Sequence, residues 1–223
     1  MVIYLDGADL SLMAQFHDKV SGFTTNPSLM RKAGISHYSG FAKHALVAAK
    51  GKPISFEVFA DDMEGMNRQA REISSWGENV YVKIPCTNTK GESTDLLIRR
   101  LASDGIKLNI TAVMTFEQIN NLCRCLTDTP AIFSIFCGRI ADTGRDPIPF
   151  ITRALTVKQH NTKVLWASTR EVLNVRQAQQ IGCDIITLTP DLLKKTEFLD
   201  RNLSDYSLET VKMFYDDSRG FSL

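Results

Sequence analysis

The chain has 223 residues, 43% of them hydrophobic, and a formal net charge of +1. This size and composition are sufficient for one sizeable core, so a single domain is expected. The near-neutral charge gives no indication of a nucleic acid or an anionic membrane as partner, and neither a transmembrane run nor a signal-peptide pattern is present, so we expect a cytoplasmic protein.

Short β-like runs alternate with longer amphipathic runs along the chain. The predicted strands are residues 2–6, 22–26, 54–58, 80–85, 107–113, 131–137, 163–169 and 184–190. The predicted helices are residues 8–18, 36–50, 62–76, 92–103, 115–126, 146–159, 170–181 and 190–196. Thr115 and Gln118 have the spacing of a capping box, and Gly105 and Gly182 suit the left-handed turn that follows a helix.

Repeated alternation of strand and helix indicates a parallel sheet. Eight such units in a chain of this length fit a closed (β/α)8 TIM barrel, an α/β fold. A doubly wound open sheet is the alternative, but the polar edge strands that it would usually have are not seen. We therefore expect a single barrel domain over residues 1–223.

One more amphipathic helix is predicted over residues 204–216, and residues 198–223 are expected to form a C-terminal helical extension of the barrel. Leu208, Val211 and Phe214 lie on one stripe of this helix. A closed barrel does not need an additional helix, so the partner expected for this stripe is a neighbouring subunit of a homo-oligomer.

Side chains of a barrel strand alternate between the helices and the barrel axis. With Lys83 of VYVKIP placed inward, the same alternation predicts that Ser168 points inward while Leu165, Ala167 and Ala112 face the helices. Most strands then send polar side chains toward the axis near their C-terminal ends, where active sites of this fold lie. The polar residues that carry this prediction are Asp6, Asn26, Glu57, Asn109, Thr111, Ser134 and Ser168.

A lysine at the centre of an apolar strand indicates amine chemistry. Lysine is almost never fully buried without a partner, and desolvation of a lysine disfavours its charged form. A neutral amine attacks ketones and forms a Schiff base. Asp6 and Glu57 are the carboxylates available for proton transfer, and Thr111 is placed to help hold a catalytic water.

Two arginines follow predicted strands, Arg139 in FCGRI and Arg170 in WASTRE, where Arg170 is expected to open a helix. Arginine suits a phosphate group because its donors are paired. Next to Ser134 and Ser168, the two arginines favour a phosphorylated substrate. The five cysteines and four histidines show no zinc-site spacing, so a metal-dependent enzyme is not favoured.

The motifs YLDGAD, GFTTNPS, VYVKIP, NITAV, FCGRI and VLWAST occur in an order and spacing that resembles the transaldolase family. The similarity is to its small-subunit group, which also contains fructose-6-phosphate aldolase. It implies a (β/α)8 barrel that transfers a dihydroxyacetone unit between sugar phosphates, without cofactor or metal. It also implies a role for eleven residues: Lys83 as the Schiff-base lysine, Asp6 as the acid/base group, Glu57 and Thr111 on the catalytic water, Asn26, Asn109, Ser134 and Ser168 on substrate hydroxyls, Arg139 and Arg170 on the phosphate, and Phe136 in the substrate site.

Two positions bear on the subtype. The aldolase branch is expected to carry glutamine where this chain has Glu57 and tyrosine where it has Phe136, so the resemblance favours a transaldolase of the pentose phosphate pathway. It also suggests a pentamer or a decamer. The alternatives are a fructose-6-phosphate aldolase that releases free dihydroxyacetone and a barrel that binds sugar phosphates without turnover.

Overall fold

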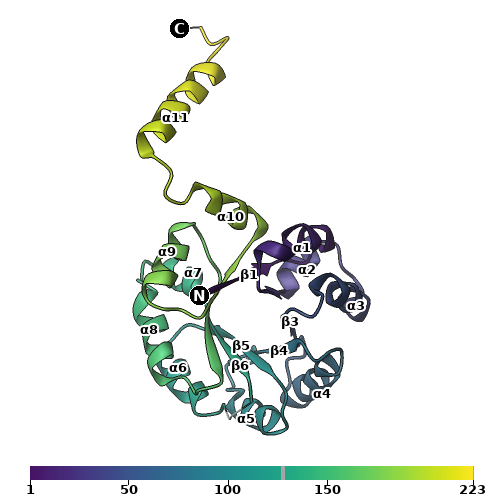
Figure 1. The fold of residues 1–223 in the computed structure, drawn as a ribbon. Coiled ribbons are helices and arrows are strands. Elements are labelled where there is room, and N and C mark those ends of the chain that lie inside the picture. Colours follow the sequence, from purple (N-terminus) through teal and green to yellow (C-terminus); the bar gives the residue numbers. More distant parts are fainter. Residues whose placement is uncertain (127–128, 223) are drawn as a thin grey trace.

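Eight parallel strands close into one barrel in sequential order, β1 to β8 (Figure 1). The computed structural model describes residues 1–126 and 129–222. The strands are β1 (Val2–Asp6), β2 (Gly22–Thr24), β3 (Ile54–Glu57), β4 (Val80–Pro85), β5 (Leu108–Val113), β6 (Ala131–Ile135), β7 (Thr162–Trp166) and β8 (Ile185–Leu188). The predicted (β/α)8 barrel is confirmed, and the open sheet is wrong because β8 pairs with β1.

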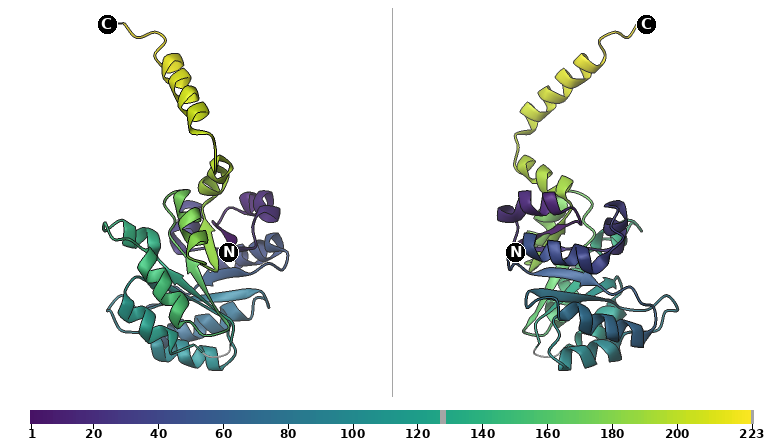
Figure 2. Two further views of the ribbon diagram at one scale, coloured as in Figure 1. Left: turned by 60° about the vertical axis from the view of Figure 1, so that its left-hand side comes forward. Right: turned by 90° about the vertical axis from the view of Figure 1, so that its right-hand side faces the viewer.

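Helices cover the outside of the barrel (Figures 1 and 2). They are α1 (Leu10–Phe16), α2 (Pro27–Lys32), α3 (Tyr38–Ala49), α4 (Met63–Ser74), α5 (Asp95–Ser103), α6 (Phe116–Cys123), α7 (Cys137–Ala141), α8 (Ile148–Val157), α9 (Leu173–Gln180) and α10 (Pro190–Lys195), followed by α11 (Leu203–Asp217). The short helices α2 and α7 were not predicted. They lie in the segments after β2 and β6, for which no element was predicted apart from Cys137, the last residue of a predicted strand and the first residue of α7.

The predicted helix signals are present. Thr115 and Gln118 form a capping box at the start of α6. The side chain of each residue accepts a hydrogen bond from the backbone N–H of the other. Gly105 and Gly182 follow α5 and α9 with φ of 79° and 69°, values that glycine adopts without the steric cost of a Cβ atom. These ends keep the loops short and fix where each following strand begins.

The core has two parts. A large apolar layer lies between the strands and the helices, and includes Phe23, Phe56 and Trp166. A smaller cluster fills the barrel axis, where Tyr81 and Phe136 pack against five buried side chains. Those five are Tyr4, Leu165, Ala167, Ile132 and Ile185. These side chains make the barrel axis a packed core and not an open channel.

Three predicted side-chain orientations were wrong. Leu165 and Ala167 belong to the axial cluster and do not face the helices, because β7 pairs Leu165 with the inward Ile185 and Ser134. Ala112, predicted to face outward, lines the axial cavity. Its φ of 59° lies where the pairing of β5 with β6 shifts register, and this backbone conformation breaks the simple alternation.

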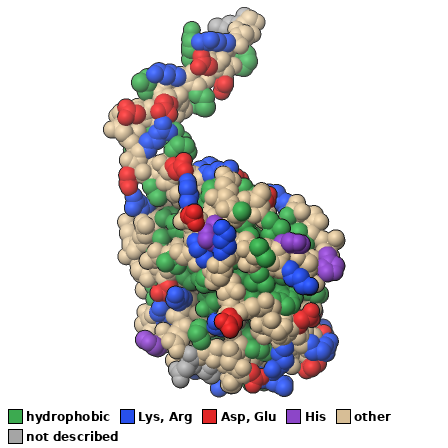
Figure 3. Space-filling view, turned by 45° about the vertical axis from the view of Figure 1, so that its right-hand side comes forward, with side chains coloured by type: hydrophobic (Ala, Val, Ile, Leu, Met, Phe, Trp, Pro, Cys, Tyr) green, Lys and Arg blue, Asp and Glu red, His purple; other side chains and the backbone are tan. Residues whose placement is uncertain are grey.

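Helix α11 projects away from the barrel (Figures 1 and 2). Among its described residues none is buried, and Val211 and Phe214 are 60% and 62% exposed. Hydrophobic and charged side chains are interspersed along this projecting arm (Figure 3). Within the described part of the chain, no helix combines the length and apolar character needed to span a membrane.

Candidate active site

A cavity of about 470 Å³ lies at the C-terminal ends of the strands. All eleven predicted site residues line it: Asp6, Asn26, Glu57, Lys83, Asn109, Thr111, Ser134, Phe136, Arg139, Ser168 and Arg170. They come from strands β1 to β7 or from the segments that follow them. The barrel therefore brings together residues that are up to 164 positions apart in the sequence, as Asp6 and Arg170 are.

Lys83 is held by two partners inside the barrel. Its side chain is 8% exposed, and Nζ lies 3.0 Å from Oε2 of Glu57. Nζ also donates a hydrogen bond of 2.6 Å to the backbone carbonyl of Thr25. The register of β3 with β4 places Glu57 directly beside Lys83. The buried ammonium is thus compensated by a carboxylate and a carbonyl, which meets the requirement for burying a charge.

Glu57 is shared between Lys83 and a hydroxyl. Thr111 donates from Oγ1 to Oε1 of Glu57 at 3.0 Å, while Oε2 faces the amine. The carboxylate therefore joins an amine to a hydroxyl from β5. A water or a substrate oxygen next to Lys83 would lie within reach of the same carboxylate, which can accept or return a proton.

Asp6 forms the centre of a second polar group. Thr24 donates to Oδ1 of Asp6 at 2.8 Å, and the hydroxyls of Thr24 and Thr187 lie 2.7 Å apart. Burial raises the pKa of Asp6 above 3.8, an effect that the charge of Lys83 and the hydrogen bond from Thr24 only partly offset. A carboxyl with a raised pKa is suited to carry a proton near neutral pH.

The polar amide of Asn109 is fixed by two serines. Ser134 donates to Oδ1 of Asn109 at 2.7 Å, and Nδ2 of Asn109 donates to Oγ of Ser55 at 3.1 Å. Asn26 has a structural role as well, because its Oδ1 caps α2 by accepting from the N–H of Leu29 at 3.0 Å. These contacts hold both side-chain amides in defined orientations.

Each arginine follows one partner of a close backbone contact, Arg139 after Gly138 and Arg170 two residues after Ser168. Arg139 is in α7, and a Cβ atom added to Gly138 would lie only 1.6 Å from the carbonyl oxygen of Ser168. Ser168 has a φ of 63°, which turns its side chain toward the cavity although Ala167 before it also points there. Arg170 does not open a helix as predicted, because α9 begins at Leu173.

Arg170 has a partner that the sequence did not reveal. Its Nε and Nη2 donate to the two carboxylate oxygens of Asp142, at 3.0 Å and 2.5 Å. Among the described residues, Arg139 makes no comparable hydrogen bond or ion pair. Asp142 follows α7 and is distant from Arg170 in sequence, so no local pattern could have identified the pair.

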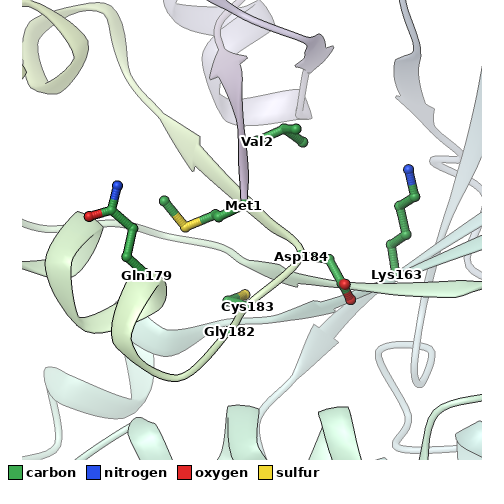
Figure 4. A pocket seen from close by; sticks show the side chains of 7 residues that line it. All are labelled: Met1, Val2, Lys163, Gln179, Gly182, Cys183 and Asp184. Carbon is green, nitrogen blue, oxygen red and sulfur yellow. The ribbon is translucent and has the colours of Figure 1, made fainter.

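A second cavity, of about 330 Å³, lies at the opposite end of the barrel (Figure 4). It is bordered by the starts of β1 and β7 and by the turn before β8, with Met1, Lys163 and Cys183 among its lining residues. Asp184 at its edge is already paired with Lys158 at 2.6 Å and accepts from the N–H of Val164. This end of the barrel therefore carries a structural ion pair.

The fold and the cavity define a class of protein: a (β/α)8 barrel with a buried lysine–carboxylate pair at the C-terminal end of its strands. Residues 3–219 match the family described as transaldolase/fructose-6-phosphate aldolase. The chain belongs to this family.

Relatives of known name agree with this assignment. A probable transaldolase of Methanococcus vannielii is 31% identical over 97% of this chain and 98% of its own. A probable transaldolase of Roseiflexus sp. is 35% identical over 94% of both chains, and one of Dehalococcoides mccartyi is 36% identical over 76% of both.

Solved structures support the fold alone. The 3-hexulose-6-phosphate synthase of Salmonella typhimurium has a TM-score of 0.61 at 17% identity, and covers 85% of this chain and 89% of its own. The KGPDC of Streptococcus mutans has a TM-score of 0.57 at 10% identity, covering 84% and 87%. Both matches fit a (β/α)8 architecture.

Proposed function

We propose that the protein is a transaldolase, which reversibly transfers a dihydroxyacetone unit from a ketose phosphate to an aldose phosphate. The observation that carries the proposal is the buried pair of Lys83 and Glu57, with Nζ and Oε2 3.0 Å apart at the active end of the barrel. A barrel that only binds sugar phosphates has no need for a buried amine, which costs free energy unless it is compensated.

The first half of the proposed reaction forms a covalent bond to Lys83. The amine adds to the carbonyl carbon of the ketose, and the carbinolamine then loses water to give an iminium. Glu57 takes and returns the protons of this step, and Thr111 holds the leaving water against the same carboxylate, in line with its hydrogen bond to Oε1.

The second half breaks and remakes a carbon–carbon bond. Asp6 accepts the proton of the ketose C4 hydroxyl, the C3–C4 bond breaks, and its electron pair moves into the iminium to give an enamine on Lys83. The shortened aldose phosphate leaves. An acceptor aldose phosphate then takes its place, the enamine attacks its aldehyde carbon to give a new iminium, and Asp6 returns the proton to the resulting hydroxyl. Water adds to this iminium with Glu57 as the proton-transfer group, which releases the product ketose and regenerates the amine of Lys83. The raised pKa of Asp6 suits it to both directions.

Substrate hydroxyls and the phosphate are assigned to the remaining lining residues. Asn26, Asn109, Ser134 and Ser168 are proposed to bind hydroxyl groups, because they line the same cavity as Lys83. Arg139 and Arg170 are proposed to bind the phosphate through charge-assisted hydrogen bonds. The substrates proposed are fructose 6-phosphate or sedoheptulose 7-phosphate as donor and erythrose 4-phosphate or glyceraldehyde 3-phosphate as acceptor.

This activity belongs to the pentose phosphate pathway, and we propose a cytoplasmic location. All five cysteines are free, and no two of them have the spacing of a C-x-x-C motif, which suits a reducing compartment. The exposed apolar stripe of α11 supports a homo-oligomer, and a pentamer or a decamer is proposed.

A coupled assay tests the function. Fructose 6-phosphate is supplied with and without erythrose 4-phosphate, and glyceraldehyde 3-phosphate and free dihydroxyacetone are quantified in the same reaction. A transaldolase forms glyceraldehyde 3-phosphate in an acceptor-dependent way with little dihydroxyacetone. Equal amounts of both products without acceptor, at the rate of transfer, would make the protein an aldolase, and no product in either case would leave a non-catalytic binder.

A further inference from the structure

We propose that Asp142 is a positioning residue, which orients the guanidinium of Arg170 for the phosphate of the substrate. The inference rests on the proposed function for the identity of the ligand, but its structural basis is independent of the covalent chemistry at Lys83. It concerns Arg139 and Arg170, the two arginines that line the cavity together with Lys83.

The pair has a two-pronged geometry. Nε and Nη2 of Arg170 donate to Oδ1 and Oδ2 of Asp142 at 3.0 Å and 2.5 Å, so one whole edge of the guanidinium faces the carboxylate. A guanidinium has five N–H donors in a fixed plane. Two are used by Asp142, and the two donors of Nη1 and the second donor of Nη2 are left for a ligand. Fixing one edge therefore fixes the direction of the other.

The carboxylate itself is held in place by the fold. Asp142 follows α7 directly, and its N–H bonds to the carbonyl of Gly138 at 2.9 Å. Gly138 in turn lies against the carbonyl of Ser168, closely enough that no side chain would fit there. Helix α7 is thus seated on the end of β7, and this contact sets the distance between Asp142 and Arg170.

Both side chains of the pair are about half exposed, 47% for Arg170 and 53% for Asp142. An exposed ion pair contributes little to stability, so a purely structural role would leave this pair almost without effect. Restricting a long side chain before a ligand arrives has a measurable effect on affinity, on the order of 0.5–1.5 kcal/mol for each side chain that binding would otherwise immobilise. That range corresponds to an affinity change of about two- to twelvefold.

The test uses glucitol 6-phosphate, a polyol phosphate without a carbonyl group, which cannot form a Schiff base with Lys83. Its affinity is measured by isothermal titration calorimetry and compared with that of glucitol. The variants are Asp142→Ala, Asp142→Asn, Arg170→Ala and the double variant Asp142→Ala/Arg170→Ala. Asp104→Ala is the matched control, because Asp104 forms a similar exposed pair with Arg71 at 2.5 Å, outside the cavity.

We expect Asp142→Ala to weaken glucitol 6-phosphate binding by about two- to twelvefold, with no change for Asp104→Ala. In the double variant the loss should equal that of Arg170→Ala alone, because Asp142 acts through Arg170. In the transfer assay the KM for fructose 6-phosphate should rise by a similar factor, with kcat within about twofold.

Three results would overturn the proposal: equal or tighter binding by Asp142→Ala, additive losses in the double variant, or no phosphate-dependent binding by the wild-type protein. Tighter binding would mean that Asp142 competes with the phosphate for Arg170. Loss of affinity in the calorimeter together with no transfer by the wild type would refute the proposed function and leave the role of Asp142 standing.

Discussion

Lys83 is an ionic residue in an apolar strand, and the register of β3 with β4 places Glu57 beside it. With Lys83 taken as inward, the two-residue period of strands predicted that Glu57 of β3 and Asp6 of β1 also point inward. The 3.0 Å contact with Glu57 and the carbonyl of Thr25 as second partner could not be predicted, because they depend on how β2, β3 and β4 align. Arg170 illustrates the same limit, since its partner Asp142 comes from a helix that the sequence pattern did not reveal.

Asp6→Asn should make the protein more stable near neutral pH. Burial raises the pKa of Asp6, so the folded state disfavours the ionised carboxylate. The stability contribution of Asp6 is fully present below pH 3.8, and it is lost as the pH rises through the folded-state value. Asparagine has no charge to bury and still accepts from Thr24.

Thermal unfolding at about pH 4 and about pH 8 measures this effect. The variant should melt roughly 2–4 °C higher than wild type at the higher pH, as about 1 kcal/mol does in a chain of this size, with a smaller difference at the lower pH. Transfer activity should be lost at both. A variant less stable than wild type at about pH 8 would contradict the burial argument.

Phe136→Tyr should increase release of free dihydroxyacetone at the expense of transfer. Phenylalanine offers neither a donor nor an acceptor to a water beside the proposed enamine on Lys83, so we expect slow protonation and hydrolysis of that intermediate. A tyrosine hydroxyl would hold such a water. Quantifying both products from fructose 6-phosphate with erythrose 4-phosphate measures the change, and Phe136→Leu is the apolar control. An unchanged product ratio in Phe136→Tyr would remove Phe136 from the control of release.

At the scale of single elements, the strands were easier to predict than the short helices. Each of the eight strands lies within a predicted β-like run, although β2 has only three residues, and the capping box of α6 was recognised from Thr115 and Gln118. Helix α7 has five residues and lacks a side-chain cap, so it has no sequence signature. The orientation of β7 was predicted incorrectly because Ser168 was taken as part of the strand, whereas its positive φ reverses the alternation.

Gly138→Ala should destabilise the protein and displace α7. Its new Cβ atom would lie 1.6 Å from the carbonyl oxygen of Ser168, which is backbone and cannot turn aside. Overpacking of this kind costs about 1–3 kcal/mol. The shift of α7 should also raise the KM for phosphorylated substrates, since Arg139 and Asp142 move with it. Urea unfolding and initial rates measure the two effects.

Gly7→Ala is the matched control, because a Cβ atom at Gly7 meets no atom within 4 Å and its φ is not positive. Its unfolding midpoint should stay close to that of wild type. Equal stability of Gly138→Ala and Gly7→Ala would show that α7 is not seated on β7 through this contact.

For the whole molecule, the barrel was predictable because strand–helix alternation repeats over most of the chain, and closure leaves no edge strand to protect. The placement of the C-terminal helix outside the barrel was harder to predict. Helix α11 was predicted as amphipathic, and the structure leaves its apolar stripe exposed in a single chain. In the proposed oligomer a second molecule covers this stripe, and the sequence of one chain holds no direct signal for the position of that molecule.

Deleting residues 200–223 should lower the assembly state. If the apolar stripe of α11 packs on a neighbouring subunit, its removal exposes that subunit's surface and shifts the mass measured by light scattering toward that of the monomer. Val211→Glu and Phe214→Glu should act in the same direction, while Lys212→Ala between them should not. A full-length protein that is already monomeric would contradict the proposed oligomer.

Borohydride trapping of Lys83 tests the central claim most directly. Borohydride reduces an iminium to a stable secondary amine, so incubation with fructose 6-phosphate and borohydride should leave one dihydroxyacetone-sized adduct per chain. Peptide mass spectrometry should place this adduct on Lys83, and Lys83→Met should carry none. An adduct on Lys52 or Lys107, or no adduct in a protein that still performs transfer, would contradict the account.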